Sequence, residues 1–232
     1  ELTGQGVDIV QVWNVAYGES KVSLSESARS SMQESRDYIE GRIANGEVMY
    51  GVNTGFGAFS DVKISNEDII QLQKNLIRSH CTGVGKPFSE EETRAIMFLR
   101  ANALARGHSG IRVDVVEKIL EFLNNGVIPV IPQQGSVGAS GDLAPLSHLA
   151  LALIGEGEVW FEGKQTPVEK VLAKKNIKPL QLQAKEGLSL INGCQVMTAV
   201  GLLNLQEAHR LCIMSDLAGA MTLEALLGTR AA

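Results

Sequence analysis

Apolar residues recur along most of this chain at the three- and four-residue spacing that is typical of amphipathic helices. Capping residues stand before these runs, and glycine or asparagine follows them. The pattern predicts helices over residues 23–45, 65–76, 89–107, 116–125 and 142–155, and a further helix that begins near residue 166.

Short motifs indicate where these helices begin. Ser65 with Asp68 is expected to start one helix, and Asp142 is expected to open another. Three further starts have capping-box spacing, in which a hydroxyl residue precedes a glutamate by three positions. They are Ser23 with Glu26, Ser89 with Glu92, and Thr166 with Glu169, where Pro167 takes the first helical position.

A long apolar-rich segment begins near Ile191 and contains almost no turn signal before Gly219. One small domain cannot cover all the apolar surface of such a helix, so we expect it to be the first member of a helical bundle. The chain is therefore predicted to comprise an N-terminal domain at residues 1–190 and the first part of a central bundle at residues 191–232, truncated in this sequence.

Strands are clearly predicted in one place only. Val159-Trp160-Phe161, followed by the turn Glu162-Gly163, has the pattern of a short hairpin. The expected fold class is mainly α: an N-terminal helical domain with a small β-hairpin, plus the start of a long-helix bundle.

Composition and charge narrow the classes of function. The 232 residues are 44% hydrophobic and 20% charged, as in globular proteins. The net charge of −5 argues against a nucleic-acid surface, and no apolar run has the length of a membrane span. The three cysteines (Cys81, Cys194, Cys212) show no close pairing, which suits the reducing cytoplasm. The histidines form no zinc motif, so no metal is expected.

The run at residues 135–146, Gly-Ser-Val-Gly-Ala-Ser-Gly-Asp-Leu-Ala-Pro-Leu, carries the most unusual chemistry. The nitrogen of Gly141 can attack the carbonyl carbon of Ala139, because glycine lets the backbone approach closely. Loss of two waters, one of them from the Ser140 hydroxyl, leaves a methylene conjugated to an imidazolone, which amines attack. Other interpretations are a plain connector, a phosphate-binding loop, which lacks its lysine, and a hydrolase nucleophile elbow, which lacks its second glycine at Asp142.

Around this run the chain resembles the aromatic amino-acid ammonia-lyase and aminomutase family, most closely its histidine ammonia-lyase branch. The matching segments lie in one register and span nearly the whole chain: 50–57, 75–80, 104–112, 139–141 and 185–193. The resemblance implies that Ala139, Ser140 and Gly141 form a methylidene-imidazolone cofactor. It also implies a helical ammonia-lyase fold, a small aromatic amino acid as substrate, and a homotetramer with no nucleic-acid or membrane partner.

The resemblance gives roles to residues before the triplet. Tyr50 is expected to be the general base that removes the β-proton of the substrate, and the alternative is a core tyrosine beside a turn. Asn53 and Gly57 belong to the turn that would close over the substrate. His80 is expected to lie against the substrate ring, where imidazole offers one donor and one acceptor, and the alternative is a histidine satisfied in the core.

Other roles fall after the triplet. Asn192 is expected to hydrogen-bond to the cofactor ring, and the alternative is an asparagine that starts the long helix. Asp142 is expected to hold the triplet in its bent shape, to cap a helix, or both. His108, His148 and Arg112 are expected to be structural.

The reaction that the resemblance implies is elimination of ammonia from L-histidine, which gives trans-urocanate. The substrate amine adds to the methylidene carbon, and Tyr50 then takes the β-proton. Tyrosine ammonia-lyase or tyrosine aminomutase stays open, since the segment that ends at His80 is also acceptable there. A folded fragment without chemistry is the third reading. In the family, an arginine for the substrate carboxylate comes from the second half of the sequence, so this chain alone is expected to be inactive, and its triplet can stay uncyclised.

Overall fold

The computed structural model describes residues 1–55, 64–138, 141–229 and 231. The helices are α1 (Ile9–Ala16), α2 (Glu26–Ala44), α3 (Asn66–His80), α4 (Glu90–Ala105), α5 (Val113–Asn124), α6 (Leu143–Leu153), α7 (Val168–Lys175), α8 (Glu186–Ile191) and α9 (Gln195–Ala225). The strands are β1 (Val84–Pro87), β2 (Ile128–Pro129), β3 (Pro132–Gln134), β4 (Glu158–Phe161) and β5 (Lys164–Pro167). The mainly α fold class is confirmed.

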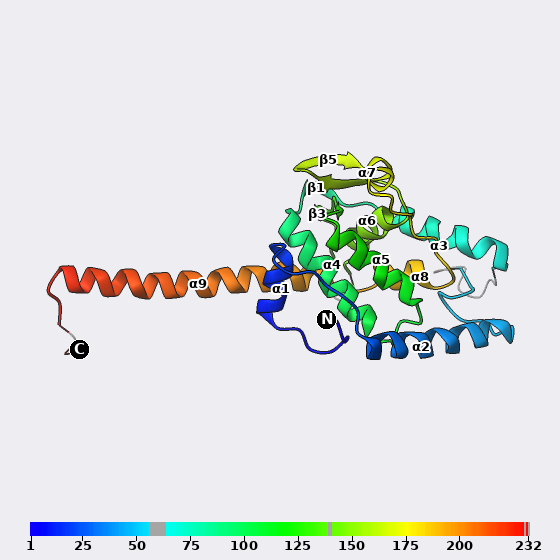
Figure 1. Ribbon diagram of the computed structural model, residues 1–232, viewed down its shortest axis with the longest axis horizontal. Coiled ribbons are helices and arrows are strands. Elements are labelled where there is room, and N and C mark those ends of the chain that lie inside the picture. The colour runs from blue at the N-terminus through cyan, green and yellow to red at the C-terminus, as the bar shows by residue number, and fades with distance from the viewer. Residues whose placement is uncertain (56–63, 139–140, 230, 232) are drawn as a thin grey trace.

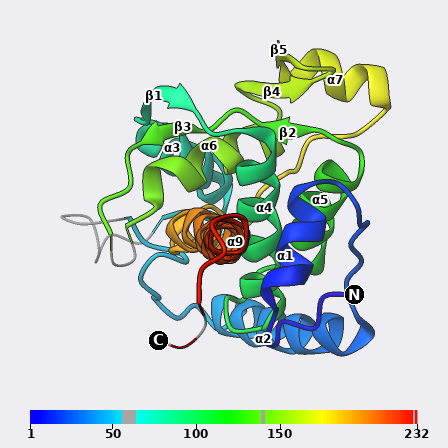
Figure 2. The same cartoon turned by 90° about the vertical axis from the view of Figure 1, so that its left-hand side faces the viewer.

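Helix α4 lies at the centre of the main body (Figure 2) and packs against α1, α2, α5 and α9. Its start confirms the predicted capping box: Glu92 N donates to Ser89 Oγ over 3.1 Å, and Ser89 N donates to Glu92 Oε2 over 2.8 Å. More than half of the residues of α4 are buried, and they lie on more than one face of the helix. Helices α3, α6 and α8 pack against one another beside it, and the candidate site lies among these elements.

The strands form two small antiparallel sheets. One pairs β1 with β3, and the other has the order β2-β4-β5. The predicted hairpin is confirmed as β4 and β5, with Trp160 opposite Gln165. The sequence did not predict β1, β2 and β3, because each has only two to four residues and pairs with a partner that is distant along the chain.

Helix α9 extends away from the main body as a single long rod (Figure 1), as predicted. Only Val196 and Ala199, both near its start, are buried. Large apolar side chains are exposed along the rest of it: Leu205, Leu211, Ile213, Met214, Leu217, Met221 and Leu223. Within the described residues, no helix combines the length and the apolar character needed to span a membrane. The domain boundary at residue 190 stays a prediction.

The predicted start of α2 was wrong by two residues. Ser25, not Ser23, is the cap of α2, since Ser25 Oγ accepts a hydrogen bond from Ala28 N at 3.2 Å. Ser23 is held in extended backbone by Leu2, whose N donates to Ser23 O over 2.7 Å and whose O accepts from Ser25 N. This contact is nonlocal, so the local pattern could not reveal it.

The predicted capping box of α7 was also wrong. Thr166 lies in β5 opposite Val159, and Pro167, opposite Glu158, occupies the cap position instead of the first helical position. No side chain caps this helix. Pairing with β4 keeps the backbone extended through Pro167, so the helix begins only at Val168.

Two short helices, α1 and α8, were not predicted. The start of α1 carries a full capping box, in which Asp8 Oδ1 accepts from Gln11 N at 2.7 Å and Gln11 Oε1 accepts from Asp8 N at 3.2 Å. Because both residues stand in the sequence at capping-box spacing, this helix had a usable local signal.

Candidate active site

Three predicted site residues, Gly57, Ala139 and Ser140, lie outside the described residues. The described part of the site consists of the backbone on both sides of the triplet and the turn between α8 and α9. Gly141 and Gly193 form an isolated parallel bridge, which joins these two segments directly. The loop that contains the triplet therefore lies against the Asn192-Gly193 turn.

Gly141 is buried, and its surroundings leave no room for a side chain. A Cβ atom at this position would stand 2.0 Å from Gly138 O and 2.7 Å from Val137 Cγ2. The loop folds back on itself here, since Val137 N donates to Gly141 O over 3.0 Å. This compact turn requires glycine at position 141, and it fits a triplet whose third backbone nitrogen must approach the first carbonyl carbon.

Asp142 is 1% exposed and stands at the cap position of α6, as predicted, but its side chain makes no capping bond to that helix. Its Oδ2 accepts from Val196 N at 2.9 Å and Met197 N at 3.0 Å, in the first turn of α9. Its Oδ1 accepts from Ser136 Oγ at 2.6 Å. Asp142 therefore caps the long helix and also braces the loop before the triplet.

Replacing Asp142 by asparagine is expected to lower the free energy of unfolding of this chain by about 1–3 kcal/mol, because an amide cannot accept all three of these hydrogen bonds. Urea denaturation of both proteins measures the difference. The matched control is Asp216→Asn on the exposed part of α9, which removes the same charge and should change the free energy by less than about 0.5 kcal/mol. Equal effects of the two variants would contradict the capping role.

The N-terminal ends of two helices lie close to Asp142. α6 starts directly after Asp142, and the first turn of α9 is bound to the same carboxylate. The N-terminal end of a helix carries partial positive charge and unpaired N–H groups. At α9 this positive end is already matched by the Asp142 carboxylate, which accepts from two of the first N–H groups of the helix.

Tyr50 lies in a turn, and 62% of its surface is exposed. Asn53, which is 2% exposed, shapes this turn: its Oδ1 accepts from Met49 N at 2.7 Å, and its Nδ2 donates to Glu47 O over 2.6 Å. Asn53 thus supports the segment that carries Tyr50. The base role of Tyr50 and a substrate contact by Asn53 stay predictions.

His80 is the last residue of α3 and is partly buried. Its Nδ1 lies 2.9 Å from Leu76 O, a contact that requires a proton on Nδ1 and leaves Nε2 as an acceptor in the neutral ring. Helix α3 packs against α6 and α8, so His80 belongs to the group of elements that holds the triplet loop. Contact with a substrate ring stays a prediction.

Asn192 ends α8 in extended backbone and does not start α9, whose cap position is taken by Cys194. The alternative reading of Asn192 as a helix-start residue is therefore wrong. Its side chain is exposed, and its neighbour Gly193 accepts a hydrogen bond from Asp142 N at 3.2 Å. The turn thus presents Asn192 next to the triplet loop.

Two of the three residues expected to be structural, His148 and Arg112, make contacts within the fold, and the structural role of His108 stays a prediction. His148 Nε2 accepts from Gly83 N at 3.3 Å, and burial lowers the pKa of this imidazole, which keeps it neutral. Arg112 donates from Nε and Nη2 to the fully buried carboxylate of Glu186, both over 2.8 Å, and this pairing raises the pKa of Arg112. The pair fixes the start of α8 to the segment before α5.

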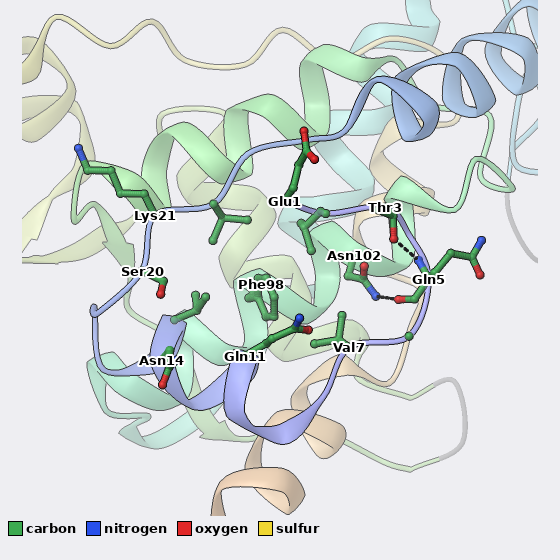
Figure 3. Close-up of a pocket in the computed structure, with 14 residues that line it drawn as sticks. Glu1, Thr3, Gln5, Val7, Gln11, Asn14, Ser20, Lys21, Phe98 and Asn102 are labelled. Carbon is green, nitrogen blue, oxygen red and sulfur yellow. Dashed lines mark hydrogen bonds between the residues drawn. The ribbon is translucent and has the colours of Figure 1, made fainter.

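A pocket of about 360 Å³ lies elsewhere, under the N-terminal segment (Figure 3). Its lining includes Leu2, Gln5, Gln11, Phe98 and Asn102, from that segment, α1 and α4. None of the predicted site residues that the structure describes lines it. The pocket is therefore separate from the triplet loop.

A sequence profile described as aromatic amino acid lyase matches residues 7–232, nearly the whole chain. The chain belongs to this family. It is similar to a histidine ammonia-lyase from Geobacillus thermodenitrificans, with 51% identity over 98% of this chain and 45% of that protein. The chain thus spans a little less than half the length of the curated relatives it matches.

Solved structures of lyase-family members have the same fold. Histidine ammonia-lyase from Trypanosoma cruzi aligns with a TM-score of 0.91 and 38% identity, over 98% of this chain and 44% of that one. Tyrosine aminomutase from Streptomyces globisporus aligns with a TM-score of 0.89 and 39% identity, over 96% of this chain and 42% of that one.

Sequence reasoning missed two residues that contact the described part of the candidate site. Ser136 braces Asp142, and Arg100 of α4 donates to Asn192 O over 3.0 Å. A signal for Arg100 was present, because this arginine directly follows the apolar run at residues 95–99 of the helix predicted over 89–107. Which backbone it would contact depends on α8, and the sequence pattern did not predict that helix.

Proposed function

We propose that the protein, at the full length of its curated relatives, eliminates ammonia from L-histidine and releases trans-urocanate. The support is the close similarity to histidine ammonia-lyases together with the glycine-only space at Gly141. That space is the observation that carries the proposal, since it matches the backbone approach needed to form a methylidene-imidazolone from Ala139, Ser140 and Gly141.

When formed, this group supplies an electrophilic carbon for the substrate amine. The residues of the chain then bind, orient and move protons. Asp142 holds the loop and the start of α9 together, and Asn192 stands on the adjacent turn. Tyr50, on its own turn, is the proposed acceptor of the β-proton.

A tyrosine ammonia-lyase or tyrosine aminomutase is the second candidate, because a tyrosine aminomutase is among the similar solved structures. The experiment that separates the two candidates uses the protein at the length of its relatives, incubated separately with L-histidine and L-tyrosine. Ultraviolet absorbance follows each acrylate product, and chromatography detects β-tyrosine. We expect urocanate from histidine, and a tyrosine product without urocanate would contradict the proposal.

His80→Leu is expected to lower kcat/KM for histidine by about 10- to 100-fold, because a polar substrate ring would lose one hydrogen-bonding partner. Ammonia release at several histidine concentrations measures this change. The matched control is Gln71→Leu on the exposed side of the same helix, which removes a polar group bonded to Asn75 and not to His80. If Gln71→Leu reduced kcat/KM as much as His80→Leu, the substrate contact of His80 would be wrong.

We also propose a homotetramer that works in the cytoplasm without a metal. The exposed apolar side chains along α9 support assembly, because a monomer rarely leaves so long a row of them in water. The three cysteines are free thiols in the structure, which fits a reducing compartment.

A further inference from the structure

Arg100 is a buried guanidinium that is not paired with a carboxylate. It lies on α4 and is 4% exposed. Among the described residues, its acceptors are two backbone carbonyls and one side-chain amide, with no carboxylate among them. Burial lowers its pKa to about 10, which still leaves it protonated at neutral pH. Its Nε has no partner among the described residues, so the hydrogen bonds of its two Nη atoms are the contacts that stabilise the buried charge and indicate its role.

The hydrogen bonds of Arg100 converge on one turn. Its Nη2 donates to Ser189 O and, over 3.0 Å, to Asn192 O, while its Nη1 donates to Gln195 Oε1 over 2.7 Å. Ser189 belongs to α8, Asn192 ends that helix, and Gln195 is the first residue of α9. Arg100 therefore binds the end of α8, the turn that follows it and the first residue of α9.

The triplet loop holds the same turn from the other side. Gly193 O accepts from Asp142 N, and Asp142 Oδ2 accepts from the first turn of α9. Gly193 itself is tightly enclosed, since a Cβ there would stand 2.4 Å from Arg100 Nη1. The turn is thus bound by the buried guanidinium of Arg100 and by the buried residue Asp142. A displacement of Arg100 or Asp142 is therefore expected to shift Gly193 relative to Gly141.

We propose that Arg100 is a positioning residue, which holds the Asn192-Gly193 turn against the triplet loop and so sets the geometry in which Gly141 closes the ring. This inference rests on the proposed function for its ring-closure part. Its structural part rests on the contacts of Arg100 alone.

The chemistry of arginine suits this role. Its planar guanidinium directs several donors at fixed angles, so one side chain can bind two backbone carbonyls and a side-chain amide at once. Lysine keeps the charge but offers a compact ammonium that cannot reach all three acceptors in one position. Arg100→Lys therefore tests geometry while preserving charge.

The first experiment measures amide hydrogen exchange in this chain. In Arg100→Lys, the amides of Asp142, Val196 and Met197 should exchange at least about tenfold faster, because the turn that they bind is released on one side. The matched control is Arg36→Lys on α2. Arg36 is 3% exposed and also donates to backbone carbonyls, those of Gly110 and Ala184.

Arg36→Lys should leave those three amides unchanged. If Arg100→Lys exchanges them no faster than Arg36→Lys does, the structural part of the inference is overturned. Should Arg100→Lys not fold, Gln195→Ala decides, since it removes only one acceptor of Arg100. Gln195→Ala should increase the same exchange rates by about threefold, and no increase would overturn the proposed positioning role of Arg100.

The second experiment uses the protein at the length of its relatives. Arg100→Lys should slow formation of the cyclised triplet, followed by the loss of two waters in intact mass. It should also reduce kcat by about tenfold with KM changed less than about twofold, because a shifted turn misplaces the reacting groups without removing a substrate contact. A merely destabilised protein would lose soluble yield instead.

The outcomes separate this inference from the proposed function. If the unaltered protein cyclises and Arg100→Lys cyclises equally fast, the inference fails while the proposed function stands. If the unaltered protein does not cyclise and has no activity, the proposed function fails together with the ring-closure part, and hydrogen exchange still decides whether Arg100 holds the turn.

Discussion

Ser140→Ala in the protein at the length of its relatives is expected to lower kcat for histidine by at least about 10³-fold, the scale seen when a group at the centre of a catalytic unit is removed. The reason is chemical, since alanine has no hydroxyl to lose and cannot supply the methylene carbon. Urocanate formation at saturating histidine measures the loss.

The folded state provides the control for this variant. The variant should remain folded, with a cooperative urea transition, because it lacks only the cyclised group and leaves every other side chain unchanged. Turnover within about tenfold of the unaltered protein would contradict the electrophile. A protein that shows no turnover with serine present would favour the reading of a folded domain without chemistry.

Gly141→Ala is expected to reduce the cyclised fraction at least about tenfold at equal times after synthesis. The added Cβ would stand 2.0 Å from Gly138 O, a distance that no folded protein accepts without moving backbone. We expect that movement to displace the nitrogen of residue 141, which must attack in ring closure, so the proximity that the reaction needs is lost. Intact mass reports the fraction of chains that have lost two waters.

The matched control for this variant is Gly41→Ala on α2 of the main body, where a Cβ would meet nothing within 4 Å. It should cyclise like the unaltered protein and be slightly more stable, since alanine favours a helix over glycine. Normal cyclisation of Gly141→Ala would show that the crowded turn is not required for ring closure.

Local patterns predicted those features of the fold that local chemistry determines. The caps at Ser65 and Ser89, the hairpin at β4 and β5 and the long helix α9 follow from residues that are close in sequence. The cap at Ser23 failed because Leu2, about twenty positions earlier, holds that residue in extended backbone. Strands β1, β2 and β3 were not predicted for the same reason, since their partners are distant in sequence.

The same distinction between local and nonlocal contacts applies to the candidate site. The triplet and its glycine could be identified from three adjacent residue types and a family resemblance. The real partner of Asp142 could not, because its carboxylate caps α9 more than fifty positions later instead of its own helix. Arg100 was missed for a similar reason: its three acceptors belong to a turn about ninety positions away.

The central claim is that this backbone makes its own electrophile from Ala139, Ser140 and Gly141. Intact mass spectrometry of the folded protein, at the length of its relatives and with confirmed histidine turnover, tests it most directly. We expect a mass lower than that of the sequence by two water molecules, with the loss mapped to the peptide that contains residue 140. An active protein that retains its full sequence mass would show that the electrophile is not made from these residues.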